Sequence, residues 1–253
     1  LFKLQRTYRE VRHDDLMKAV RVKEYGGPEA MCYDDIDVPS PGANDVLVKV
    51  EAAGINFIDT YQRSGLYQIP LPATLGLEAG GIVEEVGSDV SLFKAGDRVA
   101  YTNVAGAYAE YASVPEDKLV ALPDGVSFAE GAAAMLQGCT AHYLSQSTYK
   151  IKSGDSCLIH AAAGGVGLLL IQMAKMAGAS VIGTVSTEEK AELARAAGAD
   201  EVILYSETDF ETEVKRITDG KGVNVAYDSV GKTTFDKRID CLQRLGYMVL
   251  YGN

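Results

Sequence analysis

The fold of this chain is decided by a glycine-rich stretch, Ala161-Ala162-Ala163-Gly164-Gly165-Val166-Gly167. The stretch directly follows a predicted strand over residues 157–161 and opens a predicted helix that starts at Val166. Small residues at this spacing let the backbone turn tightly and bring a pyrophosphate to the helix N-terminus. Ala162 replaces the first glycine of the usual G-x-G-x-x-G pattern, so the strand–loop–helix context carries the inference. The stretch predicts a dinucleotide site. The alternative is a tight strand-to-helix turn in another α/β protein.

Predicted strands and helices alternate around this loop. The strands fall at residues 157–161, 181–185, 201–205, 223–228 and 247–251, and the helices at residues 166–177, 188–197, 208–218 and 233–242. This alternation is typical of βαβ units, so residues 136–253 are predicted to form a doubly wound parallel sheet of the Rossmann type.

The preceding part of the chain has a different pattern. Short β-type runs, broken by glycine and proline, lie at residues 19–22, 46–51, 81–86 and 97–100. Residues 17–135 are therefore predicted to form a mostly β domain, and residues 1–16 a leader or extension. The whole chain is predicted to be of the α/β class.

Composition and charge narrow the classes of function. The 253 residues suffice for one or two domains, and 35 acidic against 24 basic residues give a net charge of −11, which disfavours nucleic acid as a partner. No apolar run approaches the roughly 20 residues that a membrane-crossing helix needs. The four cysteines form no C-x-x-C pair, which argues against structural zinc and a secreted disulfide framework. A cytoplasmic protein is expected.

The residues after the second predicted strand of the parallel sheet distinguish NADP from NAD. Enzymes that use NAD normally place a carboxylate there to accept a hydrogen bond from the ribose 2′-hydroxyl. In this chain Val185 ends the strand, and Ser186 and Lys190 offer donors to a 2′-phosphate. Glu188 and Glu189 lie beside Lys190 and weaken this argument, but the pattern favours NADP.

Several further motifs occur in a fixed order along the chain. They are residues 53–59, 65–67, 87–90, 94–99, 106–111, 227–231 and 252–253, together with the glycine-rich loop. In these motifs the chain resembles the zinc-independent quinone oxidoreductases of the medium-chain dehydrogenase/reductase superfamily, whose members include crystallins. The resemblance implies a GroES-like catalytic domain, a Rossmann domain and NADPH in the cleft between them. Members of that family continue past Gly252-Asn253, so the Rossmann domain is expected to be C-terminally incomplete relative to the family.

The resemblance also implies that the chain binds no metal. Zinc-dependent relatives use a cysteine, a histidine and a later cysteine or aspartate, and here Asn56 and Leu77 occupy the regions of the first two ligands. A leucine side chain cannot ligate zinc. Glu78 is then expected to be a structural carboxylate. His160 is expected to be a hydrogen-bonded core histidine on a buried strand.

The site residues are carried over from the same resemblance. The residues expected to line the nicotinamide and the substrate, as the catalytic group, are Asn56, Tyr61 and Tyr67. The expected cofactor contacts are Asn56, Thr140, Gly164, Gly165, Val166, Gly167, Ser186, Lys190, Tyr205, Val230, Gly252 and Asn253. Three plainer roles stay open: Thr140 as a capping hydroxyl near a helix start, Tyr205 as a cap on the sheet edge, and the tyrosines as packed aromatics.

The implied reaction is hydride transfer from NADPH to a quinone or a conjugated enone. Such acceptors spread the incoming charge over a conjugated system, so hydrogen-bond donors can suffice where a simple ketone would need a metal. An enoyl-thioester reductase and a non-catalytic NADPH-binding structural or sensory protein are the alternatives. A homodimer is a further expectation.

Overall fold

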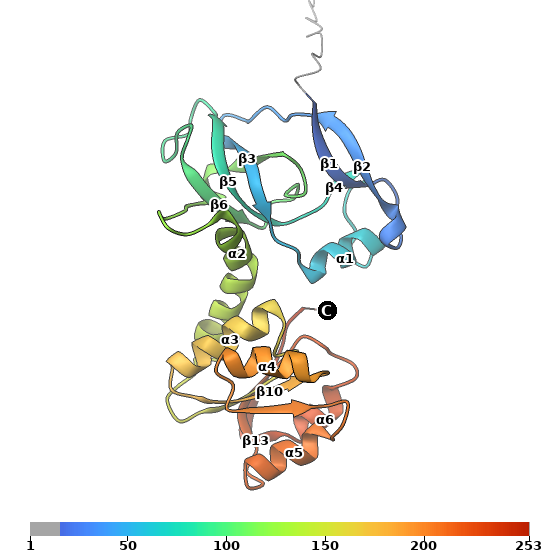
Figure 1. Ribbon diagram of the computed structural model, residues 1–253, viewed down its shortest axis with the longest axis vertical. Coiled ribbons are helices and arrows are strands. Elements are labelled where there is room, and N and C mark those ends of the chain that lie inside the picture. The colour runs from blue at the N-terminus through green and yellow to red at the C-terminus, as the bar shows by residue number, and fades with distance from the viewer. Residues whose placement is uncertain (1–15, 253) are drawn as a thin grey trace, which may run out of the picture. The chain divides into compact units, whose positions relative to one another are not determined.

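The computed structural model describes residues 16–252 of the chain (Figure 1). The chain divides into two compact units, Leu1–Leu136 and Gln137–Asn253. The predicted leader at residues 1–16 lies outside the described part except for Leu16, which belongs to the first strand.

The first unit contains a five-stranded antiparallel sheet. Its strand order is β7-β3-β5-β6-β8, and the strands are β3 (Asp45–Ala53), β5 (Glu78–Val86), β6 (Arg98–Thr102), β7 (Tyr111–Pro115) and β8 (Leu119–Ala121). Alternate residues of a strand face opposite sides of its sheet, and one face here forms the core. The core residues include Val46, Val48, Val83, Val99, Tyr101 and Val114.

A smaller antiparallel sheet completes the first unit. It contains β2 (Met31–Asp37), β1 (Leu16–Val22) and β4 (Ala73–Thr74), in that order. The first unit also contains α1 (Phe57–Ser64) and short turns of 3-10 helix at Pro28–Ala30 and Glu116–Lys118. Helix α2 (Phe128–Tyr143) begins in the first unit and ends in the second. Three of the four predicted β runs lie within β1, β3 and β5, and the fourth, 97–100, begins one residue before β6. Strands β2, β4, β7 and β8 were not among the predicted runs; β2 is rich in aspartate and lacks a buried face.

The second unit is a parallel sheet with helices on both faces. Its strand order is β11-β10-β9-β12-β13, with β9 (Ser156–Ile159), β10 (Ser180–Val185), β11 (Glu201–Leu204), β12 (Val223–Asp228) and β13 (Leu242–Leu250). The helices are α3 (Gly165–Met176), α4 (Glu188–Ala196), α5 (Phe210–Ile217) and α6 (Phe235–Ile239), and a π-helical turn occupies Leu144–Thr148.

Two hydrophobic clusters show how the helices cover this sheet. Cys157 and Ile159 of β9 pack in one cluster with α3 and α4, and Leu158 packs in the other with Phe210 and Val214 of α5. Because successive strand residues face opposite sides, the helices lie on both faces. The predicted doubly wound α/β fold, with a mostly β domain before it, is confirmed.

The prediction was wrong at the end of the second unit. The predicted helix 233–242 is only α6, and β13 starts at Leu242 instead of residue 247. The pairing of β13 with β12 shifts register, so that Leu242 lies opposite Val223 and Tyr247 opposite Val225. Leu245, at φ 64°, accommodates the extra residues. This irregularity interrupts the alternation of apolar residues, so the sequence pattern does not predict the first half of the strand.

Two further observations concern the described residues as a whole. Within residues 16–252, no helix has both the length and the apolar character needed to cross a bilayer. The four cysteines are free thiols; Cys139 is exposed, Cys32 is partly exposed, and Cys157 and Cys241 are buried.

Candidate functional site

The glycine-rich loop joins β9 to α3 as predicted. Gly164 is the N-cap of α3, and its N–H donates to the carbonyl oxygen of Ala161 at 2.9 Å. A Cβ atom at Gly167 would lie 2.5 Å from the Ala161 oxygen and 2.7 Å from the Ala162 oxygen. Only glycine therefore lets the first turn of α3 pack this closely against the loop. The first N–H groups of a helix form a ready anion site.

Two features of the loop were not visible in the sequence. Ala161 adopts a left-handed conformation at φ 50°, which glycine usually provides. The side chain of Gln137, from α2, packs directly against Gly165. A Cβ atom added to Gly165 would lie 1.8 Å from the Gln137 Oε1 atom, so only glycine leaves room for this contact. This contact joins residues far apart in the sequence, and no motif marks Gln137.

Thr140 lies in the last turn of α2, three residues before the helix ends at Tyr143. The prediction that it stands near a helix start was therefore wrong, because α2 begins at Phe128. A capping role at a helix N-terminus is excluded for this residue. Its expected contact with a cofactor stays a prediction.

The predicted 2′-phosphate residues meet at the carboxyl ends of β10 and β11. The Lys190 Nζ atom donates to the Ser186 Oγ atom at 3.3 Å. Tyr205 directly follows β11, its N–H donates to the Val185 oxygen at 3.1 Å, and its side chain is half exposed. The Glu188 carboxylate, which weakened the sequence argument, pairs with Arg195. The arrangement presents hydroxyl and ammonium donors together.

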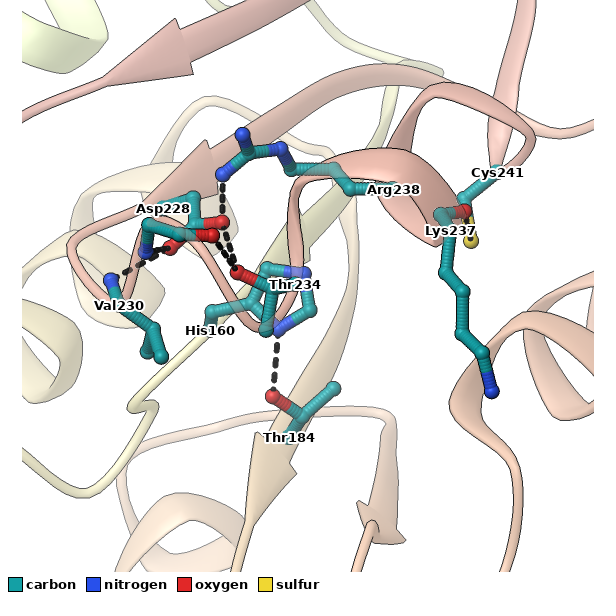
Figure 2. Close-up of polar contacts among 9 residues, drawn as sticks. His160, Thr184, Asp228, Val230, Thr234, Lys237, Arg238 and Cys241 are labelled. Atoms are coloured by element: carbon teal, nitrogen blue, oxygen red, sulfur yellow. Dashed lines mark hydrogen bonds and ion pairs between the residues drawn. The ribbon is translucent and has the colours of Figure 1, made fainter.

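The end of β12 lies beside the end of β9, because these two strands are neighbours in the sheet. Asp228 ends β12, and its Oδ1 atom accepts from the N–H groups of Val230 at 2.5 Å and Gly231 at 3.1 Å (Figure 2). After β13, the backbone N–H of Tyr251 donates to the backbone carbonyl oxygen of Asp228 at 3.0 Å. Gly252 comes next and adopts φ 69°. Asn253 lies outside the described residues.

The carboxyl ends of β9 and β12 form the place where such sheets bind ligands. The chain proceeds from β9 to β10 on one side and later returns to β12 on the other, so the strand order reverses between β9 and β12. In open parallel sheets the crevice at this switch point is the usual binding site for a dinucleotide. The loop 161–167 follows β9 and the turn after Asp228 follows β12, so these two segments flank the switch point.

His160 lies just after β9 and is 1% exposed. Its Nδ1 atom is 2.9 Å from the Thr184 Oγ1 atom, and its ring packs edge-on against Phe210 (Figure 2 shows the contact with Thr184). Burial, together with the positive charge of Arg238, lowers the pKa of His160 to about 4. The residue is a hydrogen-bonded core histidine, but it sits one residue beyond the strand.

This pKa predicts a specific dependence of stability on pH. Below pH 6.5 the unfolded chain binds a proton at His160 that the folded chain excludes until about pH 4. The free energy of unfolding should therefore fall as the pH drops through this window, by about 3 kcal/mol. Urea unfolding at pH 7 and pH 5 measures the free energy of unfolding of the unmodified chain and of His160→Gln. The variant lacks the histidine but keeps the carboxylates, so it reports their share of the pH dependence. The expected pH slope is smaller in the variant, and equal slopes would refute the assignment.

In the first unit, Asn56 is the N-cap of α1 and is 7% exposed. Its Nδ2 atom donates to the Glu78 Oε1 atom at 2.7 Å, and its backbone N–H donates to the Asp59 Oδ2 atom at 2.8 Å in a capping box. The Glu78 Oε2 atom accepts the N–H of Leu136 at 2.6 Å. Burial raises the pKa of the fully buried Glu78. Glu78 thus fixes the orientation of the Asn56 amide.

Two aromatic residues of α1 form a row with Tyr67, which follows the helix. The ring centroids of Tyr61 and Tyr67 are 5.4 Å apart, and those of Phe57 and Tyr61 are 5.5 Å apart. Phe57 is 75% exposed, and the sequence reasoning did not select it. The structure therefore brings the two predicted tyrosines together, with a third ring beside them.

An open cavity of about 520 Å³ lies next to Asn56 in the same unit. The Tyr108 hydroxyl group donates to the Asp59 Oδ2 atom at 2.5 Å on its wall, and burial raises the pKa of Tyr108. The lining is mostly apolar and includes Val20, Met31, Ile55, Thr60, Arg63 and Leu75. Asn56 is the only predicted catalytic residue among those that line it. An apolar lining with a few polar groups is typical of small-molecule sites.

The metal-ligand positions carry no ligand set. Leu77 is a buried apolar residue, 8% exposed. Among residues 16–252, no group of three or more histidine, cysteine, aspartate and glutamate side chains could hold a metal ion.

A GroES-like β domain followed by a doubly wound nucleotide domain defines the medium-chain dehydrogenase/reductase class. Residues 42–124 match the alcohol dehydrogenase GroES-like domain, and residues 165–253 match the zinc-binding dehydrogenase domain. Leu77, where the family resemblance places a zinc-ligating histidine, lies in the first of these two matches and offers no ligand atom.

Comparison with individual proteins identifies the family within this class. The chain is 50% identical over 240 residues to a quinone oxidoreductase of Pseudomonas aeruginosa, which covers 94% of this chain and 74% of that protein. The crystal structure of Escherichia coli quinone oxidoreductase complexed with NADPH superposes with a TM-score of 0.91 at 49% identity, covering 93% of this chain and 73% of the other. A 2-haloacrylate reductase of Burkholderia is 44% identical over 246 residues, 94% of this chain and 74% of that protein. The chain belongs to the quinone oxidoreductase family.

Proposed function

We propose that the chain transfers a hydride from NADPH to a quinone or a conjugated enone. The observation that carries the proposal is the pair of Ser186 and Lys190 at the end of β10, where an NAD enzyme would have a carboxylate. The relatives agree with it, since one solved structure contains NADPH and the relatives act on quinones or 2-haloacrylate by name. They support neither an enoyl-thioester reductase nor a non-catalytic protein.

The proposal assigns a task to each unit. Residues 17–135 would bind the acceptor, and residues 136–253 would bind the cofactor. The pyrophosphate would lie on Gly164, Gly165, Val166 and Gly167, and the 2′-phosphate on Ser186, Lys190 and Tyr205. The nicotinamide half would contact Asn56, Thr140, Val230, Gly252 and Asn253, and Tyr61 and Tyr67 would line the acceptor.

The residues present fit NADPH at the points where the structure can test them. Lys190 and Ser186 supply donors to a phosphate, and Gly167 leaves α3 close enough to the loop to present its N–H groups. When bound, NADPH supplies the hydride. The side chains then orient the acceptor and stabilise the charge that develops on its oxygen, by the amide of Asn56 and the phenol groups of Tyr61 and Tyr67.

Lys190 provides a direct test of cofactor choice. Lys190→Met should weaken NADPH binding roughly tenfold or more, because a charge-assisted hydrogen bond contributes about 1.5–3 kcal/mol. NADH binding should change less than about twofold, since NADH lacks the 2′-phosphate. Titration of nicotinamide fluorescence measures both. The control is Lys215→Met, which removes an exposed lysine paired with Glu211 on α5. An equal loss for both cofactors would contradict the assignment of Lys190.

The reaction itself is tested by the oxidation of NADPH in the presence of 1,4-benzoquinone and of a conjugated enone. NADPH absorbance should fall faster with protein and acceptor together than with the acceptor alone. NADPH binding without turnover on any such acceptor would overturn the proposed activity and leave a binding protein.

We also propose a cytoplasmic location and a homodimer. Four free thiols, two of them buried, suit a reducing compartment. The homodimer is carried over from the resemblance to the family. Sedimentation equilibrium measures the mass of the assembly.

A further inference from the structure

The turn that follows β12 is organised by one carboxylate. Asp228 is fully buried and accepts hydrogen bonds from the N–H groups of Val230 and Gly231 through one oxygen. Its other oxygen accepts from the Thr234 hydroxyl group at 2.5 Å and pairs with Arg238 of α6 (Figure 2). The carboxylate thus ties the turn 229–234 to the strand before it and to the helix after it.

Arg238 is an unusual member of this group. Its side chain is fully buried, and its guanidinium carbon lies 5.3 Å from the centroid of the Phe235 ring. Within residues 16–252, its side-chain nitrogen atoms have no partner that meets hydrogen-bond geometry, and its compensation is the ion pair with Asp228. Burying an arginine is costly unless its charge is paired. A simple apolar residue would fill this space at less cost, so the charge itself calls for an explanation.

The sheet order indicates which part of the cofactor this turn faces. A dinucleotide bound at the switch point extends from the α3 N-terminus in both directions. The adenosine half would lie toward β10, which is followed by Ser186 and by Lys190 of α4. Since β12 lies on the opposite side of β9, the nicotinamide half would then lie over the end of β12 and the Val230–Gly231 turn.

We infer that Asp228 and Arg238 are positioning residues for the nicotinamide half of NADPH. Arg238 neutralises Asp228 and holds its carboxylate in one orientation. Asp228 in turn holds the Val230 and Gly231 N–H groups, so the backbone under the nicotinamide keeps a single conformation. The inference rests on the proposed NADPH-dependent reduction, and it adds that α6 controls one end of the cofactor without touching it.

Two ligands separate this role from a general role in folding. NADPH occupies both halves of the site, whereas 2′,5′-ADP occupies only the adenosine half. Arg238→Met leaves Asp228 buried without its counter-charge, so NADPH affinity should fall roughly tenfold or more, about 1.4 kcal/mol. The affinity for 2′,5′-ADP should change less than about twofold, because β10 and α4 are untouched.

A second variant guards against a folding failure. Thr234→Val removes one donor to Asp228 and leaves no charge unpaired, so the protein should fold and show the same selective loss in smaller degree. Arg238→Lys restores a positive charge and should recover part of the affinity. The control is Lys237→Met, which removes the neighbouring exposed lysine that pairs with Asp209. It should alter neither affinity.

Calorimetric titration of the full chain with each ligand distinguishes the outcomes. The inference is supported if Arg238→Met and Thr234→Val bind NADPH more weakly but bind 2′,5′-ADP as the unmodified chain does, and if their kcat at saturating NADPH is lower. Equal weakening of both ligands assigns Arg238 to folding alone and overturns it, as do unchanged affinities. If the unmodified chain binds 2′,5′-ADP but not NADPH, the proposed function fails instead.

Discussion

Replacing Gly167 with alanine should remove NADPH binding and lower the stability of the second unit. The new Cβ atom would lie within 2.7 Å of two backbone oxygens, which cannot rotate away as a side chain would. The start of α3 must then move away from the loop 161–164. Overpacking of this kind costs about 1–3 kcal/mol, and the displaced N–H groups would no longer converge on the pyrophosphate. Urea unfolding and a fluorescence titration with NADPH measure the two effects.

Gly164→Ala is the matched control for stability. Its Cβ atom would lie 3.1 Å from the Ala161 oxygen, and its backbone is at φ −77°, which alanine adopts readily. The contact is tight but longer than either contact at Gly167, so the free energy of unfolding should fall less than in Gly167→Ala. If Gly167→Ala unfolds at the same urea concentration as Gly164→Ala, the close approach of α3 to its loop is not what the glycine provides.

Replacing Glu78 with glutamine should slow turnover strongly while NADPH binding survives. The two oxygens of Glu78 accept one hydrogen bond each, from Asn56 and from the Leu136 N–H. Glutamine has a single acceptor oxygen, so its NH₂ group must face one of these donors, at a cost of about 1–3 kcal/mol. The Asn56 amide would then turn or shift, and a misplacement near 1 Å can cost roughly 100-fold in rate.

Glu84→Gln is the matched control, because Glu84 lies on the same strand, β5, but is exposed. It should leave kcat and the free energy of unfolding unchanged. Steady-state kinetics with a quinone, at saturating NADPH, measure kcat for both variants. A Glu78→Gln protein with normal kcat would show that the orientation of Asn56 does not govern turnover.

The sequence predicted most of the second unit because each element there has a complete local signature. Strands β9, β10 and β12 are short apolar runs, and each helix starts and ends near the predicted residue except α6. The failure at α6 and β13 has a local cause. Cys241 enters the core immediately after the helix, and the irregularity at Leu245 breaks the alternation that reveals strands.

The candidate site was predictable only where a motif lies within one segment. The loop 161–167 and the Ser186–Lys190 pair are of this kind. The contact of Gln137 with Gly165 and the hydrogen bond of Asn56 with Glu78 join distant segments, and no local pattern marks them. Arg238 lies in a short helix whose sequence reads as a solvated surface, so its burial emerges only from the packing of α6.

The accessibility of the cysteines makes this chain convenient for site-directed labelling. Cys139 lies exposed on α2, whereas burial raises the pKa of Cys157 and of Cys241 to about 12. At neutral pH the thiolate is the reactive form, so those two thiols are effectively silent toward a maleimide. After replacement of the partly exposed Cys32, a fluorophore attaches at one position, on the helix in which the boundary between the two units falls. A single substitution, of Cys32, therefore prepares the chain for a fluorophore that can report motion between the two units.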